Sequence, residues 1–150
     1  MEVRQVLPSD EPDLVELRRR VVDDLMQYRG AAGLIAASAA TAASEDSSVH
    51  LVVTVAGVVA GEARGLLLAD SEEIPLCRIE VLCTDPELRG LGIGHLLIEA
   101  VADWAAQRSA GVMEAAALPG DRSTKNFLEA HGLVAHLIVA QGPTTGHSGR

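Results

Sequence analysis

Hydrophobic residues recur at two different spacings along this chain, and each spacing predicts a different element. Residues 2–7 and 49–68 hold dense runs of valine, leucine and alanine typical of β-strands, and Gly57 marks a predicted hairpin turn within the second run. Residues 9–29 and 91–111 place apolar side chains three or four positions apart, which predicts amphipathic helices. The pattern therefore predicts one α+β domain with a shared core.

The two long helices carry boundary signals as well as a periodic apolar face. Ser9 or Asp10 can cap the first helix, Pro12 falls in its first turn, and Gly111 ends the second helix. The arginine run at 18–20 is interpreted as a solvated face of the first helix. The residues predicted to face the core are Leu14, Leu17, Val21, Leu25 and Tyr28 of the first helix and Ile93, Leu96, Leu97, Ala100, Val101 and Trp104 of the second.

The remaining segments are shorter, and the pattern predicts them in outline. The expected elements are strands at 76–84, 112–118 and 133–140, a helix within 30–48 that continues into a loop, a short helix at 121–132, and an acidic loop at 70–75. Residues 1–141 are expected to form a single domain, because the sequence shows no internal repeat and no linker. Residues 142–150 are expected to form a flexible polar tail.

The composition narrows the classes of function. Aromatic residues make up only 2% of the chain, so the base-stacking platforms of single-strand nucleic-acid binders are not expected. The net charge of −9 disfavours nucleic acid and anionic membrane surfaces, and it favours cationic substrates such as amines. No apolar run is long enough to span a membrane, and Cys77 and Cys83 have neither metal-site nor disulfide spacing. We therefore expect a cytoplasmic protein with reduced thiols.

Three glycines, Gly90, Gly92 and Gly94, directly precede the second long helix. Glycine costs about 0.5–1 kcal/mol in a helix relative to alanine, so a specific requirement must favour it here. The unpaired N–H groups of a helix N-terminus bind phosphate, and glycines allow a ligand to approach the backbone. Residues 90–95 are therefore interpreted as a pyrophosphate-binding loop.

Two common phosphate-binding motifs do not fit this loop. The dinucleotide pattern G-x-G-x-x-G would need its third glycine where His95 or Leu97 stands, and the P-loop sequence is absent. The loop has the pattern R-x-x-G-x-G from Arg89 to Gly94. The whole stretch LCTDPELRGLGIGHLL resembles the acetyl-CoA-binding motif of the GNAT acyltransferase superfamily.

A second stretch, DRSTKNFLEAHGL, resembles another signature of that superfamily, N-x-x-A-x-x-x-Y-E-x-x-G-F. Glu129 and Gly132 match the signature, whereas Asp121 stands at the asparagine, Leu128 at the tyrosine and Leu133 at the phenylalanine. The order of predicted strands and helices agrees as well. Two motifs in the correct order are much more specific than a lone G-x-G.

The resemblance covers roughly residues 2–140 and implies the GNAT fold. That fold has a mixed, mostly antiparallel central sheet flanked by helices, like an α/β/α sandwich, here with its last strand missing or borrowed. It implies acetyl-CoA as cosubstrate, no metal, and acetyl transfer to a primary amine of a small molecule or of a peptide or protein by direct attack in a ternary complex. The alternative is a catalytically weak or inactive domain that binds acyl-CoA or a protein partner.

The resemblance also implies which residues contact acetyl-CoA. The pantetheine arm would pair with the backbone of the strand before the loop, and the loop amides would hold the pyrophosphate with basic side chains nearby. The residues assigned are Leu82, Cys83 and Thr84 for the pantetheine, Arg89, Gly90, Leu91, Gly92, Ile93, Gly94 and His95 for the pyrophosphate, and Asp121, Arg122 and Lys125 beside them. For Arg122 and Lys125, plain solvation on a short helix is an equal alternative.

A carboxylate is the first candidate for the general base that deprotonates the amine. Glu80 lies in the strand where many relatives carry such a glutamate, and strand alternation predicts that it shares a face with Leu82 and Thr84. The alternative for Glu80 is a salt bridge to an arginine on the sheet surface. Glu114, on the neighbouring predicted strand, is the second candidate for the base.

Other ionisable residues are weaker candidates for chemistry. Glu62 lies on a predicted strand, and His131 and His136 have suitable intrinsic pKa values but lie at a helix end and in the last predicted strand. A nucleophilic role for Cys83 is not favoured, because the sequence shows no base or oxyanion hole beside it.

Departures from the family pattern affect both chemistry and assembly. Leu128 replaces the tyrosine that often protonates the CoA thiolate, and Tyr28, the one tyrosine of the chain, falls in the first predicted helix. Water could protonate the thiolate, since the pKa of a thiol is about 8.5. Only one strand is predicted after Gly132 where relatives often have two, so a second subunit of a homodimer could supply the missing edge strand.

Overall fold

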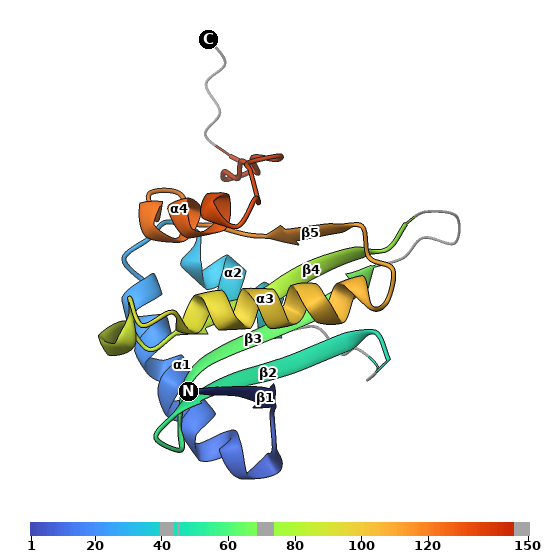
Figure 1. The fold of residues 1–150 in the computed structure, drawn as a ribbon. Coiled ribbons are helices and arrows are strands. Elements are labelled where there is room, and N and C mark those ends of the chain that lie inside the picture. Colours follow the sequence, from blue (N-terminus) through green and yellow to red (C-terminus); the bar gives the residue numbers. More distant parts are fainter. Residues whose placement is uncertain (40–43, 45, 69–73, 146–150) are drawn as a thin grey trace.

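The computed structural model describes residues 1–39, 44, 46–68 and 74–145. Within them, one sheet forms the centre of the fold with the strands in sequence order (Figure 1). The strands are β1 (Glu2–Gln5), β2 (Ser48–Val55), β3 (Val58–Leu68), β4 (Leu76–Thr84) and β5 (Val112–Ala115). Neighbours from β1 to β4 are antiparallel, whereas β5 runs parallel to β4. The predicted α+β architecture with a mixed, mostly antiparallel sheet is confirmed.

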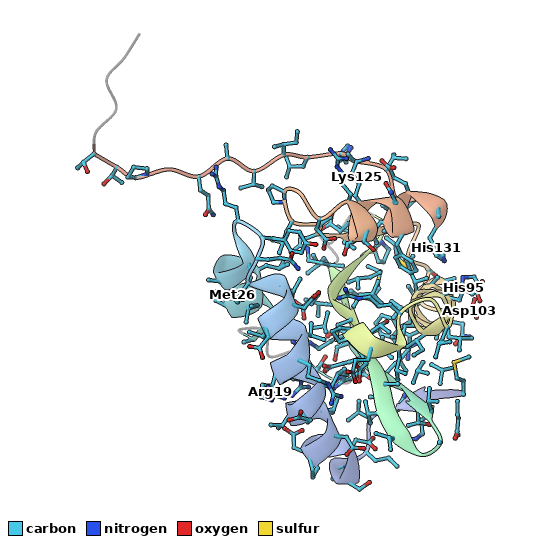
Figure 2. All side chains as sticks on the ribbon, turned by 90° about the vertical axis from the view of Figure 1, so that its left-hand side faces the viewer. Arg19, Met26, His95, Asp103, Lys125 and His131 are labelled. Atoms are coloured by element: carbon cyan, nitrogen blue, oxygen red, sulfur yellow. The ribbon has the colours of Figure 1, made fainter. Side chains whose placement is uncertain are left out.

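Helices cover both faces of this sheet, and Figure 2 shows α1 and α3 on opposite sides of it. The helices are α1 (Glu11–Leu25), α2 (Ala31–Ala39), α3 (Ile93–Ala106) and α4 (Arg122–Ala130), with short 3-10 turns at Pro8–Asp10 and Pro86–Leu88. The parallel β4–β5 pair requires a crossover, and α3 supplies it.

Two apolar clusters, one on each face of the sheet, make up the core. The α1 face packs Leu14, Leu17 and Val21 against β2 and β3. The α3 face packs the apolar side of α3, including Val101 and Trp104, against β2, β3 and β4. The predicted helix periodicity is confirmed on both faces, except that α1 ends at Leu25 and Tyr28 lies in the following turn, outside both clusters.

The predicted hairpin is also confirmed, and its turn lies between β2 and β3. Ala56 and Gly57 both have positive φ, 51° and 83°, the conformation of a two-residue turn that matches strand twist. By contrast, β5 stops at Ala115 and is shorter than the strand predicted for 112–118. Much of the predicted acidic loop at 70–75 and of the loop after α2 lies outside the described residues.

The strand predicted for residues 133–140 does not form, which is a correction to the sequence analysis. This stretch follows α4 without pairing to the described strands, although Leu133 still packs against the core. Val134, Leu137 and Ile138 are 74%, 79% and 90% exposed. A segment with a strand pattern becomes a strand only when it pairs with the edge of another strand. No described strand pairs with this segment.

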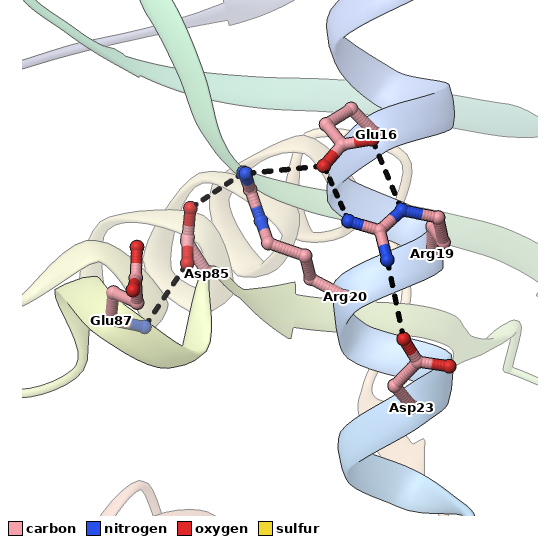
Figure 3. Close-up of polar contacts among 6 residues, drawn as sticks. All are labelled: Glu16, Arg19, Arg20, Asp23, Asp85 and Glu87. Atoms are coloured by element: carbon pink, nitrogen blue, oxygen red, sulfur yellow. Dashed lines mark hydrogen bonds and ion pairs between the residues drawn. The ribbon is translucent and has the colours of Figure 1, made fainter.

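The arginine run of α1 is solvated only at its middle residue, so the sequence interpretation was wrong for the other two. Arg18 donates through Nε and Nη2 to the carboxylate of Glu62 on β3, at 3.0 and 2.6 Å. Arg20 donates through Nη2 to Asp85 at 2.7 Å, whereas Arg19 pairs only with acids of its own helix (Figure 3). Arg18 and Arg20 therefore fasten α1 to the sheet and to the loop that follows β4.

Glu62 is the most deeply buried carboxylate among the described residues, with 2% of its surface exposed. His50 donates to it from Nε2 at 2.6 Å, in addition to the two bonds from Arg18. Burial by itself would raise its pKa, but the hydrogen bonds from His50 and Arg18 outweigh burial and lower the pKa of Glu62 to about 2. The folded state therefore gains stability from this ionised group at all pH values above its unfolded pKa.

We expect Arg18→Met to destabilise the protein much more than Arg19→Met, although both remove one charge from the same run. Arg18→Met removes two hydrogen bonds from a buried carboxylate, which costs about 2 kcal/mol after allowance for the exposed side of Arg18. Arg19→Met removes exposed pairs and costs about 0.5 kcal/mol or less.

Urea unfolding of both variants at pH 7 measures this difference. The difference should shrink as the pH falls from 5 toward 2, because protonation of Glu62 removes the charge that Arg18 compensates. Equal destabilisation by the two substitutions would show that the Arg18–Glu62 contact does not anchor α1.

Candidate functional site

The parallel pairing of β4 with β5 covers only the first part of β4. The paired residues run from Leu76 with Val112 to Ile79 with Ala115, and β4 then continues alone on that side to Thr84. Residues 80–84 thus present a backbone edge that no described strand occupies. A strand edge with unpaired N–H and C=O groups binds an extended chain by adding it as another strand.

A β-bulge lies where this open edge begins. Arg64 of β3 pairs with Val81 and Gly65 pairs with Ile79, so Glu80 is the extra residue of β4. The bulge changes the alternation, and Glu80 faces Arg64 on the α1 and α2 side of the sheet. Leu82, in contrast, packs in the α3-side cluster.

The prediction that Glu80 shares a face with Leu82 and Thr84 is therefore wrong. Strict alternation cannot anticipate a bulge, because a bulge arises from the register with the neighbouring strand. The side chains of Leu82 and Cys83 are partly buried in the α3-side and α1-side clusters respectively, so the edge at these residues offers backbone rather than side chains.

The loop after β4 leads from this edge to the N-terminus of α3. Gly90 and Gly92 have φ of 85° and 83°, a left-handed conformation that disfavours side chains, and no atom lies within 4 Å of a Cβ built on either glycine. Gly92 is the N-cap of α3 and makes no side-chain cap. The space beside Gly90 and Gly92 is therefore open, and it adjoins the positive end of the α3 helix dipole.

Gly94 differs from the other two glycines of the loop, because it allows α3 to pack closely against α4. A Cβ on Gly94 would lie 3.2 Å from Cζ of Phe127 on α4, so glycine allows the two helices to approach closely. Phe127 in turn lies 4.4 Å, between ring centroids, from His131. The first turn of α3 is thus held directly against α4, the helix of the second motif.

Arg89 and His95, both assigned to the pyrophosphate, have protein partners in this structure. The Arg89 guanidinium pairs with Asp24 near the end of α1 at 2.5 Å. His95 Nδ1 lies 2.8 Å from Nε2 of His131, and its Nε2 lies 3.2 Å from Glu99. The loop is therefore fixed to α1 on one side and to α4 on the other.

The residues assigned at the start of α4 divide into one structural residue and two exposed cations. Asp121 is buried and caps the helix, accepting from the backbone N–H of Thr124 at 3.0 Å and from its Oγ1 at 2.6 Å. Its carboxylate is therefore committed to the helix. Arg122 is exposed, and Lys125 makes an exposed pair with Glu129.

The two candidate bases lie on one face of the sheet. Glu80, whose side chain is 9% exposed, lies 3.6 Å from Nε of Arg64, and that arginine also donates to the Ser38 carbonyl of α2. Glu114 is 43% exposed and accepts from Nε of Arg78, its neighbour across the strands, at 2.6 Å. Glu80 lies immediately beyond the last β4–β5 pair, whereas Glu114 lies within the paired region.

The weaker candidates for chemistry have structural partners or lie elsewhere. Glu62 is held by Arg18 and His50 beneath α1. Burial, reinforced by the charge of Glu62, raises the pKa of the Cys83 thiol to about 12, so it stays protonated at neutral pH and is a poor nucleophile. His131 contacts His95, and His136 lies in the exposed C-terminal segment.

Tyr28 lies near the second motif, a proximity that the sequence analysis missed. A Cβ on Gly120, next to the cap of α4, would lie 3.9 Å from Cδ1 of Tyr28. A Cβ on Gly30 would likewise lie 3.8 Å from Leu118. The turn after α1 thus packs on the loop after β5, and no signal in the sequence links these two segments. Leu128, at the position of the family's tyrosine, is buried in the core.

No helix among the described residues is long and apolar enough to cross a membrane. No group of three or more histidine, cysteine, aspartate or glutamate side chains in the described part of the chain is arranged to hold a metal ion.

Solved structures with the same fold were found by comparison of the whole chain. A tetramutant of the Bacillus halodurans protein BH1408 has a TM-score of 0.77 and 19% identity, covering 95% of this chain and 99% of that one. The Acinetobacter haemolyticus aminoglycoside 6'-N-acetyltransferase AAC(6')-IG has a TM-score of 0.70 and 16% identity, covering 97% and 99%. Aminoglycoside N-acetyltransferase AAC(6')-Iy, solved in complex with CoA, has a TM-score of 0.68 and 18% identity, covering 95% and 99%.

These likenesses establish the fold, and no curated protein sequence matches the chain. The model of the acetyltransferase (GNAT) family matches residues 14–133, which include the β4 edge, the glycine loop and α4. The chain therefore belongs to the GNAT acetyltransferase family.

Proposed function

We propose that this protein is an acetyl-CoA-dependent N-acetyltransferase that transfers the acetyl group directly to a primary amine. One observation carries the proposal. The open edge of β4 at residues 80–84 is followed, after the short 3-10 turn at Pro86–Leu88, by a glycine loop and the N-terminus of α3. An extended arm that ends in a pyrophosphate matches both features.

The described residues offer groups that match the pantetheine and the pyrophosphate of acetyl-CoA. The backbone of Leu82, Cys83 and Thr84 would pair with the pantetheine amides. The N–H groups of residues 90–95 would hold the pyrophosphate. Arg122 and Lys125, exposed at the start of α4, supply positive charge on a protein whose net charge is −9.

An arm paired along the open edge would put the thioester end of the cosubstrate next to Glu80, the extra residue of the bulge. In the proposed reaction the amine nitrogen attacks the thioester carbonyl, a C–N bond forms, and the C–S bond then breaks. Glu80 accepts the proton of the amine, directly or through water. Because Leu128 offers no hydroxyl, water protonates the leaving thiolate, which is a good leaving group.

The acceptor would approach from the α1 and α2 side of the sheet, where both candidate bases lie. Arg64 with Glu80 and Arg78 with Glu114 make this face a band of alternating charge. The acidic protein as a whole attracts cationic molecules, which favours a small cationic amine or an amine of a peptide or protein. A catalytically inactive acyl-CoA-binding domain is the alternative, and the buried Leu128 is the observation that favours it.

Gly92→Asp should weaken acetyl-CoA binding at least tenfold, because it puts a side chain and a negative charge where the pyrophosphate would lie. Gly57→Asp is a matched control, since Gly57 has the same φ of 83° and equally open space but lies in the β2–β3 turn. Calorimetric titration of both folded variants measures the effect. Equal affinities for the two variants would contradict the loop as the cofactor site.

Asp24→Asn should strengthen acetyl-CoA binding severalfold at low ionic strength, because it releases the Arg89 guanidinium toward the loop. Asp23→Asn removes the same charge one residue away, where the partner is Arg19 rather than Arg89, and should leave the affinity nearly unchanged. Titrations at about 0.02 and 0.5 M salt separate the two, since screening removes the gain. Weaker binding by Asp24→Asn alone would instead mean that the pair holds the loop in shape.

Glu80→Gln should lower kcat for amine acetylation by about 10²–10⁴, the contribution typical of a general base, with acetyl-CoA affinity unchanged. Glu114→Gln should change kcat by less than about tenfold. Steady-state assays over a panel of amines measure both. A larger loss for Glu114→Gln would reverse the assignment, and acetyl-CoA binding without turnover by the wild type would favour the inactive domain.

A further inference from the structure

Two histidines meet where the first turn of α3 packs against the end of α4. His95 is the third residue of α3, and His131 directly follows the last residue of α4 (Figure 2). Nδ1 of His95 lies 2.8 Å from Nε2 of His131, which is the distance of a hydrogen bond, and the ring centroids are 5.1 Å apart. These two residues are called the histidine pair below.

The two outer nitrogens of the histidine pair both face groups that accept hydrogen bonds. Nδ1 of His131 lies 2.8 Å from the carbonyl oxygen of Phe127, which can only accept, so this nitrogen carries a hydrogen. Nε2 of His95 lies 3.2 Å from the carboxylate of Glu99, which also only accepts when it is ionised. The contact between the two rings needs one further hydrogen, because one nitrogen donates there and the other accepts.

The hydrogen-bond partners therefore determine the charge of the histidine pair. Three contacts need three N–H hydrogens, whereas two neutral imidazoles carry two and two imidazolium rings carry four. With two hydrogens, one contact would join a lone pair to an acceptor. With four, two N–H groups would point at each other across the 2.8 Å contact. Three hydrogens satisfy every contact, so the pair shares one extra proton and carries one positive charge.

The other charged groups near the histidine pair come from α3, α4 and the glycine loop. Glu99 of α3 is the one that a described contact joins to the pair, and both side chains of this contact are exposed, 53% for His95 and 59% for Glu99. The others have a different partner or lie farther along a helix: Glu129 with Lys125, Arg89 with Asp24, Arg122 at the start of α4, and Asp103 one turn beyond Glu99 (Figure 2).

We propose that His131 is a positioning residue that holds His95 as a cation for the phosphates of acetyl-CoA. This inference rests on the proposed function, in which His95 is the last residue of the loop that holds the pyrophosphate. A cation in the first turn of a helix is disfavoured by the helix dipole. The hydrogen bonds to His131 and Glu99 offset this cost in the free protein, and a bound phosphate would offset it further.

Titration of the full chain with acetyl-CoA at about pH 6 and about pH 8.5 tests the role of His95. Histidine loses its proton over this range, so the wild type should bind more tightly at the lower pH. A phosphate monoester also titrates near pH 6, so each variant is compared with the wild type at the same pH, where the titration of the ligand cancels. His95→Gln should weaken binding about tenfold at the lower pH and less than about twofold at the higher pH.

Substitutions of His131 separate positioning from packing. His131→Phe keeps a flat ring but removes the acceptor for the N–H of His95, so it should weaken binding severalfold at about pH 6 and much less at about pH 8.5. His131→Gln offers an amide oxygen in place of Nε2 and should restore most of the affinity at the lower pH. His136→Gln is the matched control, because His136 is exposed in the segment after α4. A loss for His131→Phe that is equal at both pH values, or no loss, overturns the proposal.

Nitrogen-15 NMR of the histidine side chains in the free protein tests the charge of the pair without any ligand. We expect three N–H hydrogens on the two rings at about pH 6, and two neutral rings at that pH would overturn the proposal. The titrations distinguish this failure from failure of the proposed function. Equal affinities of the wild type and His95→Gln at both pH values would overturn the role of the pair alone, whereas no acetyl-CoA binding by the wild type would overturn both.

Discussion

The rest of this structure depends on a parallel strand pair that is only four residues long. β5 ends at Ala115 while β4 continues to Thr84, so the two strands separate halfway along β4. Backbone groups that a longer β5 would satisfy remain available for a ligand. The bulge at Glu80 lies at the point of separation and turns a carboxylate toward the face where the acceptor would enter. Ending β5 early thus leaves an open backbone edge on β4.

Arginine–carboxylate pairs keep the elements around this edge in place. Arg18 binds the buried Glu62 of β3, and Arg20 binds Asp85 at the end of β4. Arg89 of the loop reaches back to Asp24. All three pairs join α1 to the sheet or to the loop after β4, so they hold this helix and the glycine loop in fixed positions relative to each other. Arg18 and Arg20 thereby compensate the charges of Glu62 and Asp85, which are buried.

The departures from the family motifs have different consequences. Asp121 for asparagine is conservative in its local role, since either side chain caps a helix, and here the carboxylate binds the backbone and hydroxyl of Thr124. Leu128 for tyrosine removes a hydroxyl and adds to the core instead. The chemistry of the proposed reaction then rests on the base and on the thiolate as a leaving group, without a protein acid at this position.

The sequence by itself determined the local elements and the two motifs. The spacing of apolar residues and the positions of glycines act over a few residues. They therefore predicted the helices and the strands from β1 to β4, whereas β5 is shorter than predicted. Only the tertiary structure decided on which face of the sheet Glu80 lies, which carboxylate Arg18 binds, and that Tyr28 lies near Gly120. Strand register, burial and packing decide these features, and they join residues that are far apart in the chain. The segment 133–140 has a strand pattern but no strand, since a strand exists only where a second edge receives it.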